Sequence, residues 1–219
     1  MQFTRTTLAA LFSAAALLPA AALAQDAKAP VTPAKAGAAD AKAAAPTTCA
    51  AKMKMGKTLN VKLTTSMGPI ALELDSEKAP LTVVNFATYV DAGHYNGTIF
   101  HRVIPTFMIQ GGGFNKDMSE RPTRGPLKNE AANGLKNDIY TISMARRQDP
   151  DSATGQFFIN VTNNDMLNRS ASSAGYAVFG KVTSGQDVVD KIKAVPTGNS
   201  GPFQNVPTTP VVIEKAECV

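Results

Sequence analysis

Apolar and polar residues alternate in several short segments of this chain, a pattern that predicts β-strands. Residues 59–64 and 70–74 both follow it, and the intervening Ser66-Met67-Gly68-Pro69 contains turn-forming residues, so we predict a β-hairpin here. Six more segments have a similar character and are predicted strands: residues 98–103, 107–111, 139–145, 156–161, 176–182 and 209–216.

Two other segments carry apolar residues at the longer spacing of a helix. Residues 80–91 begin with Pro80 and are followed by Gly93, which suit the first turn of a helix and the position after its last turn. We expect its buried side to contain Leu81, Val84 and Tyr89. The second predicted helix covers residues 185–193, and its buried side contains Val188, Val189 and Ile192.

The order of these elements indicates the fold class. Strands that do not alternate with helices favour an antiparallel sheet. Eight short strands can bury one face of that sheet by closing into a barrel. The prediction is therefore a mainly β protein, with a closed eight-stranded antiparallel barrel capped by two α-helices.

The N-terminus has the three parts of a signal peptide. Arg5 is basic, residues 8–18 form an apolar run of 11 residues, and Ala22-Leu23-Ala24 is a small-residue cleavage site. The run is too short to cross a hydrocarbon core of about 30 Å. We therefore expect residues 1–24 to be removed on export, leaving a mature protein with no stable membrane insertion, in the periplasm or secreted beyond it.

Residues 25–57 have a different composition from the rest of the chain. Twelve of these 33 residues are Ala, and large apolar side chains are almost absent. Such a segment buries too little surface to offset the entropy lost on ordering. We expect a disordered linker, acting as a tether or as a tail that binds a membrane or cell wall, followed by one folded domain at residues 58–219.

The formal charge of +5 resides outside this predicted domain. Residues 25–57 contain six Lys and two Asp, whereas residues 58–219 contain 15 basic and 15 acidic residues. A domain with no net charge gives no support for a nucleic-acid-binding face, and no nucleic-acid partner is expected. The chain has only two His and two Cys, which argues against a zinc finger or a multi-His metal enzyme.

Candidate chemistry is concentrated in residues 100–112, Phe-His-Arg-Val-Ile-Pro-Thr-Phe-Met-Ile-Gln-Gly-Gly. If the chain bends near Phe107, Arg102 and Gln110 converge on one face, and apolar side chains line a pocket beside them. An arginine placed among apolar residues needs a hydrogen-bond acceptor. From these residues alone, Arg102 either faces such a pocket or extends to solvent and pairs with a distant acid.

Three further blocks follow along the chain: Ile142-Ser143-Met144-Ala145, Gln156-Phe157-Phe158-Ile159-Asn160 and Val178-Phe179-Gly180-Lys181-Val182. Together with residues 100–112, and in this order, they resemble the cyclophilin family of peptidyl-prolyl cis-trans isomerases, specifically its exported bacterial type. The resemblance covers about residues 58–217. It implies a cyclophilin-like barrel and a monomeric enzyme without cofactors, which accelerates rotation about X-Pro bonds in unfolded or partly folded exported proteins and so assists their folding.

Carried over position by position, the resemblance implies that Arg102 is the catalytic residue, stabilising the twisted amide. The substrate-binding residues that it implies are Phe107, Met108, Gln110, Ala145, Arg146, Phe158, Met166, Leu167 and Tyr176. Among these, apolar side chains hold the proline ring, Gln110 bonds the substrate backbone, and Ala145 and Arg146 lie beside the residues that precede proline. We expect a structural role for His101 and a surface position for His94.

Two of these positions depart from the cyclosporin-sensitive eukaryotic members of the family. Met166 replaces a tryptophan and Tyr176 replaces a histidine. Neither residue donates to the rotating amide, so catalysis is expected to survive. Loss of the flat indole ring and its N–H predicts weak cyclosporin binding.

Functions of two other classes fit parts of the sequence. Ser200, with His101 and several Asp upstream, has an order that a serine-hydrolase triad allows, but residues 198–202 are Gly-Asn-Ser-Gly-Pro and typical of a flexible turn. A holdase chaperone or proline-peptide binding module would use the same groove without turnover. Retention of Arg102 favours catalysis, because a pure binder needs only the pocket.

Cys49 and Cys218 are the only two cysteines. Export favours disulfides, and the first and last strands of such a barrel are expected to be neighbours. Cys49, however, lies within the predicted linker. The sequence therefore leaves open both an intramolecular disulfide and two free thiols.

Overall fold

The structure, a computed structural model, describes residues 48–53 and 56–219. The expected signal peptide at residues 1–24 and the portion of the expected linker at residues 25–47 lie outside the described residues. Within the described part of the chain, no helix has the length and apolar character needed to cross a membrane.

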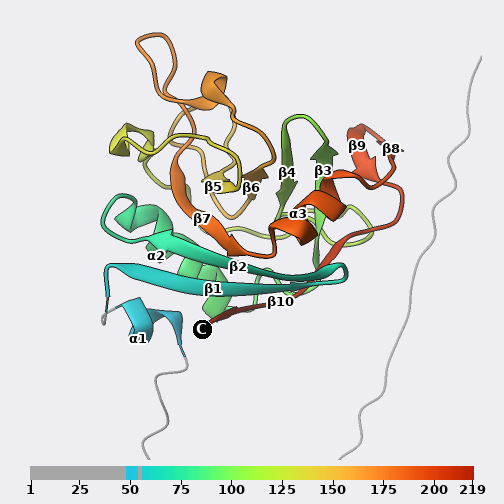
Figure 1. Cartoon of the computed structure of the whole chain (residues 1–219), viewed down its shortest axis with the longest axis horizontal. Helices are drawn as coiled ribbons and strands as arrows, with labels where there is room; N and C mark the ends of the chain where they lie inside the picture. Colours follow the sequence, from blue (N-terminus) through green and yellow to red (C-terminus); the bar gives the residue numbers. More distant parts are fainter. Residues whose placement is uncertain (1–47, 54–55) are drawn as a thin grey trace, which may run out of the picture. The chain divides into compact units, whose positions relative to one another are not determined.

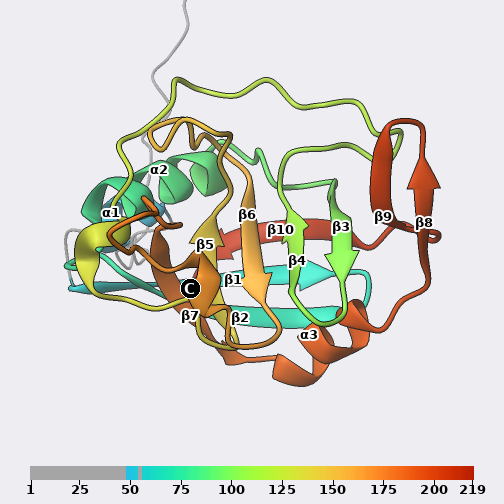
Figure 2. The same ribbon diagram turned by 90° about the horizontal axis from the view of Figure 1, so that it is seen from above.

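Eight strands form a closed barrel in which every neighbouring pair is antiparallel (Figures 1 and 2). Their order around the barrel is β1-β10-β3-β4-β6-β5-β7-β2. Their bounds are β1 Thr58–Thr65, β2 Gly68–Asp75, β3 Thr98–Ile104, β4 Met108–Gly111, β5 Thr141–Met144, β6 Phe157–Asn160, β7 Val178–Ser184 and β10 Val212–Cys218. Each overlaps a predicted strand, with bounds that differ by up to three residues, and the predicted fold class is confirmed.

The interior of the barrel follows from the alternation along its strands. In β1, Leu59, Val61 and Leu63 are buried and the side chains between them are more exposed. Thr65 pairs with Gly68 across the tight turn, so β1 and β2 form the predicted hairpin.

In the part of the chain that the structure describes, three α-helices accompany the barrel: α1 Cys49–Met53, α2 Pro80–Asp91 and α3 Gln186–Lys193. The two longer ones are the predicted helices. In α3 the buried residues are Val188, Val189 and Ile192, as predicted.

The predicted orientation of α2 is wrong for two of its three residues. Tyr89 is buried, but Leu81 and Val84 are each 51% exposed. Phe86 faces the core instead, with its ring centroid 5.6 Å from that of Phe157 and 5.3 Å from that of Phe179. Apolar residues occur on more than one side of this helix, so the fit of the Phe86 ring among core phenylalanines decides which side is buried.

A second, two-stranded sheet is absent from the sequence prediction. β8 Thr197–Ser200 and β9 Phe203–Pro207 form a hairpin beside the barrel (Figure 2), where a flexible turn was expected. Its residues are mostly polar or glycine and give no apolar alternation to detect. The hydrolase alternative gains no support here, because His94 bonds the carbonyl oxygen of Gly112 and His101 Nδ1 has no partner among the described residues.

Helix α1 lies within the range predicted to be a disordered linker, and that part of the prediction is wrong. Cys49 is only 1% exposed and is disulfide-bonded to Cys218, with their Cα atoms 5.3 Å apart. Figure 1 shows the C-terminus beside α1. The Asp91 carboxylate also accepts the backbone N–H groups of Cys49 at 2.8 Å and Ala50 at 3.2 Å. These partners are distant in sequence, so local composition does not reveal that the folded domain begins before Thr58.

Candidate active site

Strands β3 and β4 bring Arg102 and Gln110 together. The two residues are directly paired across the antiparallel ladder, so their side chains leave the same face of the sheet. The turn between the strands is closed by a hydrogen bond from the Phe107 N–H to the carbonyl oxygen of Ile104. The convergence that the sequence predicted is therefore present.

Neighbouring segments complete the wall around this pair. β6 places Phe158 opposite Gln110. Further residues come from the chain after β5, from the short 3₁₀ helix η2 Asp165–Leu167, and from the segment before β7. Nine of the ten predicted site residues line one hollow of about 100 Å³: Arg102, Phe107, Met108, Gln110, Ala145, Arg146, Phe158, Leu167 and Tyr176.

Met166 is the exception, and its expected substrate-binding role at the edge of the pocket stays a prediction. Its side chain is 74% exposed and does not line the hollow, whereas its neighbour Leu167 does. Consecutive residues of a 3₁₀ turn point in directions about 120° apart, because the turn has about three residues. Correspondence with a family motif gives the position of Met166 but not the direction of its side chain.

The guanidinium of Arg102 has unused hydrogen-bonding capacity. Arg102 is half-buried, and within the described part of the chain no hydrogen bond or ion pair joins its guanidinium to another residue. Among the described residues no carboxylate lines the hollow, whose charged residues are Arg102 and Arg146. Of the two possibilities that the sequence left open, the structure contains the arginine that faces a pocket.

Arg146 is held by the protein itself. Its Cζ lies 4.4 Å from the centroid of the Tyr176 ring, and its Nε donates to the carbonyl oxygen of Gly175 at 3.1 Å. The Tyr176 ring in turn meets Phe158 edge to face, with centroids 5.8 Å apart. This stack forms one continuous side of the hollow.

Gln110 is oriented by a residue that the sequence interpretation missed. Its Nε2 donates to Oε1 of Gln156 at 3.0 Å. Gly113 makes room for this partner, because a Cβ at that position would lie 2.4 Å from the Gln156 side chain. Gln156 is the first residue of a block that resembles the family, and this position was the only indication in the sequence that it belongs to the site.

Comparisons with known proteins agree with this geometry. The family model described as "Cyclophilin type peptidyl-prolyl cis-trans isomerase/CLD" matches residues 60–218. The chain belongs to the cyclophilin family. Its curated relatives are peptidyl-prolyl cis-trans isomerases, and this cyclophilin is an enzyme of that type.

Relatives and solved structures cover most of the described chain. Peptidyl-prolyl cis-trans isomerase cyp18 of Streptomyces antibioticus is 60% identical over 160 residues, covering 72% of this chain and 96% of the relative. Peptidyl-prolyl cis-trans isomerase B of Escherichia coli K12 is 56% identical over 153 residues, covering 68% and 93%. A cyclophilin type isomerase of Cryptosporidium parvum, solved in the presence of the dipeptide Ala-Pro, matches with a TM-score of 0.61 and 25% identity, covering 73% and 98%.

The two histidines of this cyclophilin are both removed from solvent to some degree. His101 is 4% exposed, and its ring centroid lies 4.5 Å from that of Phe114. Burial, together with the nearby charge of Arg102, lowers the pKa of His101 to about 4. Its imidazole is therefore neutral at pH 7, which fits a structural role. The expected surface position of His94 is wrong, because its half-buried ring packs 4.5 Å from the Tyr89 ring.

A second, larger hollow adjoins the first and was not foreseen. Its volume is about 540 Å³, and it shares Gln110, Ala145 and Arg146 with the first hollow. Charged residues of both signs line the remainder: Glu120, Arg124, Arg147, Asp149 and Asp151. The two hollows are contiguous at the three residues that they share.

Proposed function

We propose that Arg102 is the catalytic residue of this isomerase and that unfolded or partly folded proline-containing polypeptides are its substrates. The observation that carries the proposal is a half-buried guanidinium that has no side-chain partner among the described residues, on the wall of a hollow that also contains Phe107, Phe158 and Leu167. The Cryptosporidium parvum relative, solved in the presence of Ala-Pro, supports a proline-containing ligand.

The reaction requires rotation about a bond with partial double-bond character. The barrier is about 18–20 kcal/mol, because twisting the amide breaks its resonance. For X-Pro bonds the cis and trans forms differ by only about 0.5–1 kcal/mol, so the enzyme has to accelerate an exchange that is already near balance. No covalent bond is made or broken.

A hydrogen-bond donor beside the prolyl nitrogen stabilises the twisted amide selectively. In the planar amide the nitrogen lone pair is delocalised into the carbonyl, and in the twisted amide it returns to the nitrogen and accepts a hydrogen bond. The Arg102 guanidinium would therefore bind the transition state more strongly than the ground state, which is the condition for a faster rate.

The remaining walls would hold the substrate while one side of the bond turns. Phe107, Met108, Phe158 and Leu167 offer an apolar surface for the pyrrolidine ring. Gln110, oriented by Gln156, would bond the substrate backbone. Ala145 and Arg146 border both hollows and would lie beside the residues that precede proline.

We place this activity in the periplasm and infer a monomeric enzyme that assists the folding of exported proteins. The signal-peptide features of residues 1–24 support export. The zero net charge of residues 58–219 supports polypeptides rather than nucleic acids as partners. Weak cyclosporin binding is expected, because Met166 supplies neither an indole N–H nor a flat ring.

Substitution of Arg102 tests the mechanism. Arg102→Ala should lower kcat/KM on a short Ala-Pro peptide by about 10²–10³-fold, the usual effect of losing one transition-state donor. Arg102→Lys should restore little, because an ammonium cannot present the planar fork of a guanidinium. NMR exchange spectroscopy measures both variants directly.

Arg146→Ala is the matched control, since it removes a guanidinium from the same hollow. That guanidinium is bound to Gly175 and stacked on Tyr176, so its loss should act mainly on peptide binding and leave the exchange rate of bound peptide nearly unchanged. Near-wild-type exchange in Arg102→Ala would contradict the proposed role.

A holdase that uses the same groove is the second candidate function. The apolar side chains of the hollow, such as Phe107 and Phe158, would also bind proline segments of unfolded chains without catalysing their isomerisation. Aggregation suppression measured on Arg102→Ala separates the two, because a holdase keeps its activity when isomerisation is lost. Loss of both activities together would argue that protection depends on catalysis.

A further inference from the structure

Buried asparagine side chains lie behind the walls of the hollow. Asn137, Asn160 and Asn164 are each at most 2% exposed, and the neighbouring Ser143 is fully buried. They come from the loop before β5, the end of β6 and the residue before η2. Polar groups at this depth are tolerated only where hydrogen bonds satisfy them.

These side chains are bonded to one another. Asn137 Oδ1 accepts from Ser143 Oγ at 2.7 Å and from Asn160 Nδ2 at 3.3 Å. Asn160 Oδ1 accepts from Asn164 Nδ2 at 2.7 Å, and the Asn164 N–H donates to the Asn137 carbonyl oxygen at 2.8 Å. The four residues form one connected network, which we call the asparagine network.

The network reaches outward to the main chain of the hollow. Asn137 Nδ2 lies 3.2 Å from the carbonyl oxygen of Leu167 and 3.4 Å from that of Tyr176. Asn164 Nδ2 donates to the carbonyl oxygen of Phe107 at 2.8 Å. Three wall residues from three separate segments are thus tied to two asparagine amides.

The wall residues need this support because no strand contains them. Phe107 lies in the turn between β3 and β4, Leu167 lies in η2, and Tyr176 precedes β7. A residue within a barrel strand has its main chain fixed by the ladder, as Arg102 and Gln110 do. The network adds side-chain hydrogen bonds to the few main-chain ones that these residues make, such as that from the Tyr176 N–H to the Leu167 carbonyl oxygen.

We propose that Asn137 and Asn164 are positioning residues that hold the apolar walls of the proline pocket at the correct spacing. The proposal rests on the proposed function of that hollow. Neither asparagine lines the hollow. They act through the main chain of Phe107, Leu167 and Tyr176, so they set how tightly proline is bound and leave the Arg102 chemistry unaffected.

The test separates binding from rotation. Asn137→Ala should weaken binding of a short Ala-Pro peptide by about tenfold or more, the effect of about 1.4 kcal/mol. The exchange rate of the bound peptide should remain within about twofold of wild type, because β3 and β4 hold Arg102 independently. NMR titration gives the affinity, exchange spectroscopy gives the bound-state rate, and the Leu167 methyl signals report movement of the wall.

Asn133→Ala is the matched control. Asn133 Nδ2 donates to the Val178 carbonyl oxygen at 2.9 Å and its Oδ1 accepts the Leu135 N–H at 3.0 Å, but neither partner lines the hollow. This variant removes a comparable asparagine bridge and should bind the peptide as wild type does. If Asn133→Ala weakened peptide binding as much as Asn137→Ala does, the loss of affinity would be due to general destabilisation, and the proposal would be overturned.

A milder variant covers the case in which Asn137→Ala does not fold. Asn168 is half-buried, and its Oδ1 accepts from Asn137 N at 2.7 Å and Asn137 Nδ2 at 3.1 Å. Asn168→Ala loosens η2 from the network and should weaken peptide binding in the same sense. A folded Asn137→Ala or Asn168→Ala variant with wild-type affinity would overturn the positioning role.

Failure of the proposed mechanism gives a different result from failure of this proposal. Loss of the Arg102 role would appear as an unchanged bound-state rate in Arg102→Ala, whatever the asparagine variants do. Loss of the positioning role would appear as unchanged affinity in the asparagine variants, with the Arg102 result intact.

Discussion

Arg102 and Arg146 are the same kind of side chain in one hollow, and their surroundings give them different roles. Arg146 is committed to the Gly175 carbonyl oxygen and the Tyr176 ring, while Arg102 has no such contact within the described residues. A guanidinium bound to protein acceptors makes the wall rigid, whereas one without them remains available to a substrate. Neighbouring groups, more than residue type, decide function at this scale.

Met166 gives a prediction about inhibitor binding. Met166→Trp should tighten cyclosporin binding by about tenfold or more, because an indole at this exposed position next to Leu167 offers a flat surface and an N–H donor. Met166→Leu, which adds neither, is the control. Inhibition of isomerisation by cyclosporin measures both, and a nanomolar inhibition constant for the unsubstituted protein would contradict the expected weak binding.

His101 gives a prediction about pH. Its pKa is about 4 in the folded protein, below the value of about 6.5 expected in the unfolded chain. Between these values the unfolded state binds more protons, so the free energy of unfolding falls as pH decreases from about 6.5 and levels off below about 4. We expect His101 to contribute about 2 kcal/mol to the loss of stability between pH 7 and pH 4.5, measured by urea denaturation.

A variant isolates the contribution of His101 to this loss. His101→Phe keeps an aromatic ring against Phe114 and removes the titrating group. The difference in unfolding free energy between pH 7 and pH 4.5 should shrink by about 2 kcal/mol. Burial also lowers the pKa of His94, which remains in both proteins and cancels in the comparison. An unchanged difference would show that His101 is not responsible.

Helix α2 shows what a single element can and cannot specify. Pro80 and Gly93 mark its ends in the sequence, and the observed helix begins at Pro80 and ends at Asp91. Its buried side depends on the barrel, where Phe86 meets the rings of Phe157 and Phe179. The ends of a helix are local properties, whereas its orientation is a property of the packing partner.

The orientation of α2 predicts a large loss of stability for one substitution and almost no change for another. Phe86→Ala should lower the free energy of unfolding by about 3–5 kcal/mol, because it removes a buried ring and leaves a cavity. Val84→Lys, on the exposed side, should change it by less than about 0.5 kcal/mol. Chemical denaturation compares the two, and a large effect at Val84 would mean that the helix is turned the other way.

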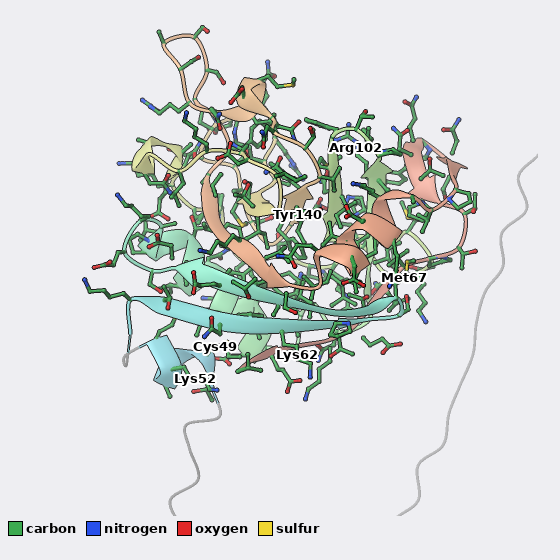
Figure 3. All side chains as sticks on the ribbon, viewed as in Figure 1. Cys49, Lys52, Lys62, Met67, Arg102 and Tyr140 are labelled. Atoms are coloured by element: carbon green, nitrogen blue, oxygen red, sulfur yellow. A yellow bond between two sulfur atoms is a disulfide. The ribbon has the colours of Figure 1, made fainter. Side chains whose placement is uncertain are left out.

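At the scale of the whole molecule, the disulfide joins the first described residues to the last strand. Cys49 and Cys218 are 169 positions apart in sequence, and the bond fixes α1 beside the end of β10. Asp91 adds two hydrogen bonds to the backbone of α1. Figure 3 shows Cys49 and Arg102 on different sides of the domain, so this closure is remote from the hollow.

Reduction of this disulfide should therefore affect stability and spare activity. The chain-entropy model gives an upper value of about 5 kcal/mol for a loop of this length. We expect Cys49→Ser/Cys218→Ser to unfold at lower denaturant concentration, with kcat/KM on an Ala-Pro peptide unchanged under native conditions. A reductant should lower the denaturant concentration at which the wild-type protein unfolds and should not affect the double variant. Equal stability of the wild type and the double variant without reductant would contradict the prediction.

The sequence by itself determined what depends on neighbours along the chain. Alternation identified the eight barrel strands, because one face of each strand must be buried. This step did not need the resemblance to a protein family. The roles of the residues near Arg102, in contrast, were assigned through that resemblance. The hairpin of residues 197–207 escaped notice, because its polar and glycine residues bury too little apolar surface to leave a pattern.

Only the tertiary structure decided what depends on residues far apart in sequence. It determined the buried side of α2, the outward direction of Met166, the place of α1 and its disulfide, and the partner that orients Gln110. It also revealed the asparagine network behind Phe107, Leu167 and Tyr176. The partners of these side chains come together only when the barrel closes. The periodicity of residues along one strand therefore carries no information about the directions and hydrogen bonds of these side chains.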